Sequence, residues 1–254
     1  MSTLTISRPP AAAAMLWIKE AWRLFKLAPI PWMGMTALVF MVVIGINMLP
    51  WIGRYAIELL SPFLVAGYFS ASRAARAGEP VSFIHLAAGV NSGRGALLRI
   101  GGLYMAGSIL IVALVDAATG GNLHELMQSV QNPAALTPEQ ANRIVATGLP
   151  AMLMASVLFT PLLMATWFAP GLALFEDFSA GRALWWSLWA CWVNWRPILY
   201  YSTVLGLFGM VAIVIPFGLG MLVFLPLTLI STYVAYLAIF TLSADPAAGD
   251  DGLP

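Results

Sequence analysis

Apolar side chains fill six long stretches of this chain, and the charged side chains gather at the ends of those stretches. Runs of about 18 or more apolar residues are long enough to cross the hydrocarbon core of a bilayer as helices. The predicted spans are residues 32–49, 51–75, 100–118, 149–175, 198–215 and 219–242. Because none of the stretches alternates as a barrel strand would, the pattern predicts an all-α fold, a polytopic membrane helical bundle with six transmembrane helices.

The remaining residues surround one membrane domain, which the pattern predicts over residues 15–243. Its largest connection is an outer loop, residues 119–148. Within that loop Thr137, Pro138 and Gln140 are typical of a capping box with proline at the first helical position, which predicts a short helix through Val145. The acidic tail, residues 244–254, has nothing apolar to bury, and residues 1–14 and this tail are both predicted to be disordered.

Lysine and arginine residues are unequally divided between the two sides of the predicted bundle. Ten of the 12 lie in the N-terminal segment and in the second and fourth connections, and the opposite side holds only Arg54 and Arg143. An excess of these residues marks the cytoplasmic side of a membrane protein. The distribution therefore predicts a protein of the bacterial inner membrane with both termini in the cytoplasm.

Two segments on this predicted cytoplasmic side are typical of helices that lie along a membrane surface. In residues 15–27 three cations, Lys19, Arg23 and Lys26, follow one helical face and would meet lipid headgroups. Before the fifth span comes a tryptophan-rich stretch that contains Trp185, Trp186, Trp189, Trp192 and Trp195. These indoles predict an interfacial belt, and the alternative is an aromatic cage for a quaternary ammonium group. Residues 83–99 are a third interfacial candidate, weakened by glycines.

A similar unit recurs three times along the chain, each with an interfacial segment, a shorter span and a longer span that contains proline. The three prolines, Pro62, Pro161 and Pro226, are predicted helix kinks. An aromatic residue follows each of them at an offset of six or seven positions. The hypothesis is three helical hairpins around a pseudo-threefold axis, and the alternative is chance similarity among apolar sequences.

Polar residues at membrane depth are candidates for function because their burial in lipid is unfavourable. Arg54 and Glu58 share one face of the second predicted span, four residues apart, and Asn47 lies near the end of the first. They form the candidate intramembrane polar site. The alternative is an ion pair near the outer interface, with the Arg54 side chain reaching outward to water.

The composition excludes several other classes of protein. Only 9% of the residues are charged, against about 25% in soluble proteins, and the net charge of +1 does not favour a partner as anionic as nucleic acid. Cys191 is the only cysteine, and His85 and His124 are expected on opposite sides of the membrane. We therefore expect no metal site, no cofactor and no catalytic residues.

Three segments carry a resemblance to a known family: residues 17–25 before Pro29, the Leu60-Ser61-Pro62-Phe63 motif with Ala66-Gly67, and residues 183–197. Together they resemble an uncharacterised family of six-span bacterial inner-membrane proteins. That family is distantly similar to the membrane domain attached to some glycerophosphodiester phosphodiesterases. The shared motifs are packing and interface features, and we expect no appended soluble enzyme domain, so the resemblance does not imply phosphodiesterase activity.

The sparse polar groups within the spans favour a non-catalytic scaffold or accessory factor that acts through lipid or protein contacts. The rival function is a small-molecule or lipid transporter with its polar site at Asn47, Arg54 and Glu58, and an enzyme is the third candidate. Membrane lipids are the expected partners. The sequence identifies neither a protein partner nor an oligomeric state.

Overall fold

A computed structural model of the chain describes residues 3–49, 53–131 and 137–243. The helices in chain order are α1 (Ala13–Leu27), α2 (Pro29–Asn47), α3 (Gly53–Arg76), α4 (Ala88–Asn91), α5 (Arg94–Ala118), α6 (Asn122–Gln131), α7 (Pro138–Trp167), α8 (Ala169–Phe175), α9 (Ala180–Val193), α10 (Trp195–Val214) and α11 (Leu219–Ile239). Two short 3₁₀ helices, η1 (Phe83–Ala87) and η3 (Pro216–Gly218), and two strands, β1 (Thr3–Ile6) and β2 (Phe240–Ser243), complete the described elements. The chain is a multi-pass membrane protein with an all-α bundle.

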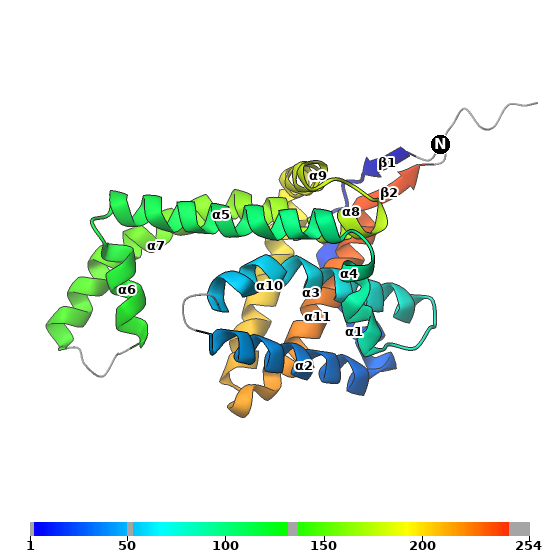
Figure 1. The fold of residues 1–254 in the computed structure, drawn as a ribbon, viewed down its shortest axis with the longest axis horizontal. Helices are drawn as coiled ribbons and strands as arrows, with labels where there is room; N and C mark the ends of the chain where they lie inside the picture. The colour runs from blue at the N-terminus through cyan, green and yellow to red at the C-terminus, as the bar shows by residue number, and fades with distance from the viewer. Residues whose placement is uncertain (1–2, 50–52, 132–136, 244–254) are drawn as a thin grey trace, which may run out of the picture.

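Five helical segments are long and apolar enough to cross a bilayer, where the sequence predicts six. They are α2, α5, α7 continued by α8, α10 and α11. The predicted second span corresponds to α3, which carries charged residues near both ends and several serines and small residues between them. Since α3 packs against α2, α5, α8 and α11, much of its surface meets protein, and it has less need of apolar side chains than a lipid-facing helix. Figure 1 shows α3 in the middle of the bundle.

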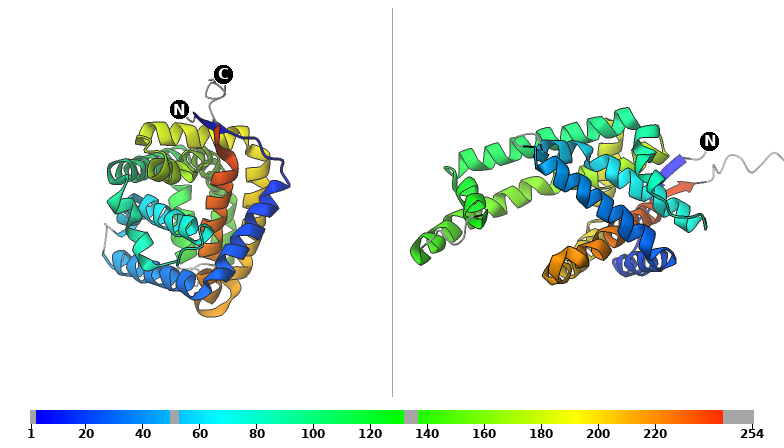
Figure 2. Two further views of the ribbon diagram at one scale, coloured as in Figure 1. Left: turned by 90° about the vertical axis from the view of Figure 1, so that its right-hand side faces the viewer. Right: turned by 60° about the horizontal axis from the view of Figure 1, so that its bottom comes forward.

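The helices follow a cyclic order of packing. η1 and α4 lie on α3, α9 lies on α7, and α1 lies on α11. Each segment that precedes a hairpin therefore contacts the second long helix of the hairpin before it, and α1 closes the cycle. Figure 2 shows α1 running beside α10 and α11. This order is compatible with three hairpins around a pseudo-threefold axis, which stays a prediction.

The fourth predicted span, residues 149–175, is divided in the structure at Phe168. The Ser187 hydroxyl of α9 accepts from the Phe168 backbone N–H at 2.9 Å and donates to the Met164 carbonyl oxygen at 2.7 Å. A side chain that enters the hydrogen-bond ladder of a helix in this way bends it. Pro170, just beyond, has no N–H to continue the ladder. The chain therefore turns from α7 into α8, whereas Pro62, Pro161 and Pro226 lie inside continuous helices.

The predicted outer loop, residues 119–148, is largely helical. The capping box at Thr137 and Gln140 is present, with a Thr137 Oγ1 to Gln140 N distance of 3.3 Å. The helix that it starts does not end near Val145 but continues as α7 to Trp167, since Pro150 in its interior removes only one backbone hydrogen bond. Figure 1 shows α5 and α7 side by side, with α6 packed at their far end.

The expectation of a disordered N-terminus is wrong for Thr3–Ile6. This segment forms β1, which pairs antiparallel with β2 and places Thr3 opposite Ser243 and Ile6 opposite Phe240. The sixth predicted span also ends earlier than expected, at Ile239, because the last residues of that range belong to β2. We call the pair formed by β1 and β2 the terminal ribbon. The predicted disordered tail, residues 244–254, and residues 1–2 lie outside the described residues.

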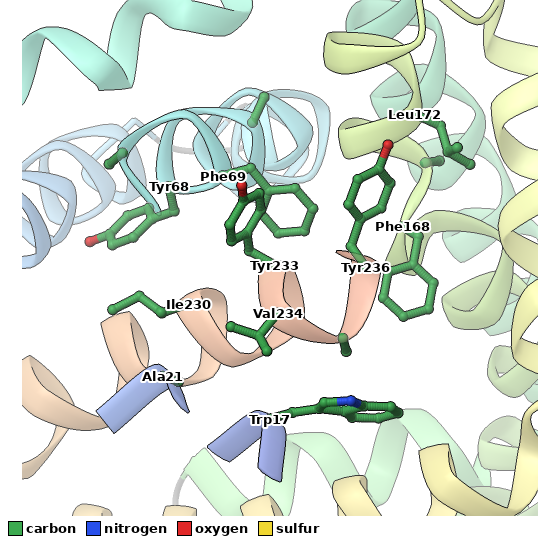
Figure 3. Packing of buried hydrophobic residues seen from close by; sticks show 14 of the residues in the cluster. Trp17, Ala21, Tyr68, Phe69, Phe168, Leu172, Ile230, Tyr233, Val234 and Tyr236 are labelled. Carbon is green, nitrogen blue, oxygen red and sulfur yellow. The ribbon is translucent and has the colours of Figure 1, made fainter. Parts of the chain in front are cut away.

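The main core lies where α1, α3, α8 and α11 meet. Phe69 of α3 is fully buried, and its ring centroid lies 5.6 Å from Tyr233 and 5.8 Å from Tyr236 of α11. Trp17 of α1 contacts α10 through Tyr201, at 5.6 Å between ring centroids. Figure 3 shows the rings of Tyr233 and Tyr236 on one side of α11 and Trp17 on the other. Aromatic contacts therefore join α3 to α11 and α1 to α10, and α11 lies between α3 and α1.

Candidate functional site

Glu58 of α3 is half-buried and accepts a hydrogen bond from the Ser108 hydroxyl of α5, at 2.6 Å to Oε2. The contact joins helices that touch closely elsewhere, since Gly101 of α5 lies against the Leu59 carbonyl group. A charge-assisted hydrogen bond between a hydroxyl and a carboxylate is stronger than one between neutral groups. The Glu58 carboxyl group is therefore held at the junction of α3 and α5.

The structure describes the side chains of two of the three residues of the predicted polar site, Asn47 and Glu58, so the site as a whole stays a prediction. Asn47 is exposed, and its amide nitrogen donates to the Val43 carbonyl oxygen of its own helix at 2.9 Å. The Arg54 side chain lies outside the described residues. Ser108, which sequence reasoning missed, is the described partner of Glu58. Ser108 is a small polar residue in a mostly apolar span, and it lies 50 positions after Glu58 in the sequence. Only the packing of α5 on α3 therefore reveals this contact.

A cavity of 420 Å³ opens beside Glu58. Its walls come from α3, α5, α7, α8 and α11, so it lies among the second long helices of the three hairpins. Pro62, Val65, Leu163, Trp167 and Leu229 form much of the apolar lining. The volume is within the usual range for pockets that bind small molecules, about 300–1,000 Å³.

Five hydroxyl-bearing side chains also line this cavity: Ser61, Tyr104, Thr166, Thr228 and Thr232. Four of them donate to carbonyl oxygens of their own helices: Ser61 to Glu58, Thr166 to Leu162, Thr228 to Phe224 and Thr232 to Thr228, at 2.9, 3.0, 2.9 and 2.9 Å. A hydroxyl that has used its proton keeps lone pairs as acceptors. The Ser61 contact also satisfies the carbonyl group that Pro62, which has no N–H, leaves without a helical donor. These hydroxyls, with the carboxylate, give the cavity mostly hydrogen-bond acceptors.

Hydroxyl groups also join the two helices of the first and third hairpins. Thr36 of α2 lies 2.8 Å from the Tyr68 hydroxyl of α3. The Tyr201 hydroxyl of α10 lies 2.7 Å from Ser231 and 3.1 Å from Thr232 of α11. Tyr68 follows Pro62 by six positions and Thr232 follows Pro226 by six. Each contact contributes about 0.6–2 kcal/mol within a membrane, and together they fix the helices that carry the cavity walls.

The cations of the predicted interfacial helix, Lys19, Arg23 and Lys26, are exposed on α1, whereas the opposite face of α1 packs on α11. Arg23 forms an ion pair with Glu20, with N–O distances of 2.6 and 2.8 Å. The hydrogen bonds from Arg23 hold the pKa of the Glu20 carboxyl group below its usual value. Lipid contact by the three cations stays a prediction.

Of the five predicted belt tryptophans, Trp185, Trp189, Trp192 and Trp195 are exposed. Trp186 is half-buried and makes an edge contact with Phe178, at 5.6 Å between ring centroids. Trp185, Trp189 and Trp192 line a mostly apolar groove of 600 Å³ between α9 and α7, which also contains Pro161. Among the described residues no close ring contact joins two of the five indoles, so the arrangement suits an interfacial belt better than a closed aromatic cage.

The reactivity of the Cys191 thiol can be used to test the packing of α9 on α7. Its side chain is 1% exposed, its thiol lies 3.5 Å from the Met164 carbonyl oxygen, and burial raises its pKa to about 12. Because the thiolate is the reactive species, we expect a maleimide at pH 8 to label Cys191 in folded protein at least about a hundredfold more slowly than in protein unfolded in dodecyl sulfate. Mass spectrometry of the labelled protein measures both rates. Equal rates would contradict the packed position of α9.

Within the described part of the chain no three His, Cys, Asp or Glu side chains come together as a metal site requires. His85 contacts Ser70 at 3.4 Å, and His124 contacts Gln128 at 2.9 Å. The two histidines therefore belong to different regions of the fold.

Comparison with known proteins gives one informative match. The chain is 26% identical over 244 residues to a probable inner membrane protein of Burkholderia thailandensis, with 91% of this chain and 89% of the relative covered. No family model matches the sequence, and no solved structure is similar to it. The description of the relative as a probable inner membrane protein and the five apolar helices in the described part of this chain both indicate a multi-pass membrane protein. The resemblance to the membrane domain of some phosphodiesterases stays a prediction.

Proposed function

We propose that this membrane protein binds an amphipathic small molecule, such as a lipid, in the cavity beside Glu58 and acts as a non-catalytic accessory factor through that contact. The observation that carries the proposal is the 420 Å³ cavity, in which apolar walls surround one carboxylate and five hydroxyl-bearing side chains. Ligand sites in proteins are mostly apolar with a few convergent polar groups, and this lining has that character.

The hydrogen-bonding groups of the cavity define the chemistry of its ligand. Glu58 and the hydroxyl oxygens of Ser61, Thr166 and Thr228 act as acceptors. A buried acceptor is stabilised by a donor, so the polar end of the ligand carries hydroxyl or amine groups. The apolar walls accommodate its hydrocarbon part.

The proposal includes six crossings, with α3 as the sixth, and both termini in the bacterial cytoplasm. Three observations support it: the pairing of β1 with β2, which brings the ends of the domain together, the ten cationic residues predicted on that side, and the description of the relative as a probable inner membrane protein. Reporter fusions to the two termini test the topology. Reporters that respond on opposite sides of the membrane would contradict it.

The ligand-binding proposal is tested by blocking the cavity. Thr166→Trp places an indole in the cavity, whereas Thr203→Trp changes a matched threonine that is exposed on α10 and likewise donates to a carbonyl oxygen of its own helix. We expect small molecules that copurify with the wild type to be reduced at least about tenfold in Thr166→Trp and unchanged in Thr203→Trp. Mass spectrometry of protein purified from native membranes measures this. Equal retention by both variants would contradict the proposal.

Transport is the second candidate function, and the carboxyl group in the cavity favours it. The junction between α7 and α10 is also less closely packed than the equivalent junctions of α5 with α3 and of α2 with α11. Glu58→Gln keeps an acceptor for Ser108 but cannot exchange a proton. If the protein transports its ligand with protons, uptake of the copurified molecule into proteoliposomes will lose its dependence on the pH gradient in Glu58→Gln. An unchanged flux in this variant would favour the accessory role.

A further inference from the structure

A second hollow, of 620 Å³, lies at the opposite end of α3 from Glu58, where the terminal ribbon meets the helices. Its polar lining includes Arg73 and Arg76 from the last turn of α3, Tyr233 and Tyr236 from α11, and one carboxylate, Glu176. Leu4 of β1 and Leu237 and Phe240 provide an apolar wall. Guanidinium groups beside apolar side chains match the two parts of a phospholipid.

The two arginines carry positive charge that the described residues do not neutralise at close range. Both are exposed, and neither forms an ion pair within 4 Å in the described part of the chain. Of the carboxylates in this region, Glu176 lines the hollow and accepts from the Tyr236 hydroxyl at 3.2 Å, and Glu20 is bound by Arg23. Glu79 lines a separate pocket with Arg73 and forms no ion pair with it within 4 Å in the described part of the chain. The Arg73 guanidinium lies 5.2 Å from the Phe175 ring centroid, which holds it at the edge of the hollow.

Cations in the last turn of a helix also stabilise the helix dipole, which alone would explain Arg73 and Arg76. The tyrosines distinguish a binding site from that explanation. Tyr233 and Tyr236 lie three residues apart on one side of α11, as Figure 3 shows, and their rings are buried against Phe69. The described residues give the Tyr233 hydroxyl no hydrogen-bond partner, although it borders the hollow. A hydroxyl donor beside two guanidinium groups is a typical set of phosphate ligands.

We propose that this hollow binds the phosphate of an anionic phospholipid through Arg73, Arg76 and Tyr233, with the start of its acyl chains against Leu4, Leu237 and Phe240. The apolar wall favours a lipid over free phosphate, which would gain nothing from it. Because the terminal ribbon forms part of the wall, the bound lipid also joins the two ends of the domain to the membrane. The site is independent of the cavity at Glu58.

The experiment is a titration of detergent-purified full-length protein with dioleoylphosphatidylglycerol, followed by native mass spectrometry, with dioleoylphosphatidylcholine as the neutral comparison. The test variants are Arg73→Gln/Arg76→Gln and Tyr233→Phe. The control is Arg94→Gln/Arg99→Gln, which removes the same charge from exposed positions of α5 outside the hollow. Size-exclusion profiles and unfolding temperatures establish that each variant is folded, and Tyr233→Phe, which keeps its buried ring, serves if the double variant fails to fold.

We expect Arg73→Gln/Arg76→Gln to weaken phosphatidylglycerol binding at least about tenfold, because each cation near an anionic surface contributes several-fold to affinity. Tyr233→Phe weakens it by a smaller factor, and the control binds as the wild type does. Wild-type affinity in the Arg73/Arg76 variant, or an equal loss in the control, would overturn the proposal. Displacement of the lipid by an equal concentration of inorganic phosphate would identify a soluble anion as the ligand and overturn the lipid assignment.

Discussion

Phe69→Ala is expected to destabilise the folded protein by about 3–5 kcal/mol, the usual cost of removing a fully buried phenyl ring. The ring fills the space between α3, α8 and α11, where it contacts Phe175, Tyr233 and Tyr236. Gly171 of α8 leaves room for it, because a Cβ atom there would lie 2.7 Å from the ring. Neither water nor an acyl chain can fill the resulting void as completely, so the contacts are lost.

Thermal unfolding of detergent-purified protein measures this effect, and a decrease of roughly 10 °C or more in the midpoint corresponds to the expected loss. Phe208→Ala is the matched control, since Phe208 is 49% exposed on α10. We expect it to change stability by less than about 0.5 kcal/mol. Equal decreases for the two variants would show that Phe69 does not occupy the center of a core.

Gly101→Ala is expected to cost about 1–3 kcal/mol through steric overlap between α3 and α5. A Cβ atom at Gly101 would overlap the Leu59 carbonyl oxygen, and a helix backbone cannot move aside as a side chain can. The helices would have to separate, which would also lengthen the hydrogen bond between Ser108 and Glu58. We therefore expect Gly101→Ala to lower both the unfolding temperature and the amount of copurified ligand.

The next residue provides the control for this effect. A Cβ atom at Gly102 would meet only the Leu59 Cδ1 atom, at 3.9 Å, which is an ordinary contact. Gly102→Ala is expected to leave stability unchanged or raise it by up to about 1 kcal/mol, because alanine favours a helix more than glycine does. Of these two neighbouring substitutions on one helix, only Gly101→Ala is therefore expected to lower stability. A loss of stability in Gly102→Ala equal to that in Gly101→Ala would contradict the close approach of α5 to α3.

The apolar pattern located the long helices because the thickness of the bilayer sets the length of each apolar stretch, and that length can be read from the stretch itself. For five of the predicted spans, most ends lie within three residues of the helix ends in the structure; the exceptions are the starts of α5 and α7, which come earlier than predicted. The capping box at Thr137 was confirmed, and it starts α7. Exposed Lys19, Arg23 and Lys26 likewise follow from helical periodicity alone. These features depend only on residues that are close together in the sequence, so they can be predicted from a single sequence.

Contacts between distant residues had no such local signal. The pairing of Thr3–Ile6 with Phe240–Ser243 brings together the two ends of the chain, and a four-residue segment does not reveal its partner. Ser187 interrupts α7 at Phe168 from a different helix, so the break could not be seen in the apolar run itself. For the same reason Glu58 was identified as a polar residue within a span, whereas its partner Ser108 was not.

The sequence by itself therefore determined that this is a membrane protein, which segments are long and apolar enough to cross a bilayer and which ends of those segments carry the positive charge, because hydrophobic length and charge act segment by segment. Only the tertiary structure decided which helices enclose Glu58, how β1 pairs with β2, and that Arg73, Arg76 and Tyr233 line one hollow. Those arrangements depend on shape complementarity between helices far apart in the chain, and apolar sequences of similar composition do not distinguish one packing partner from another.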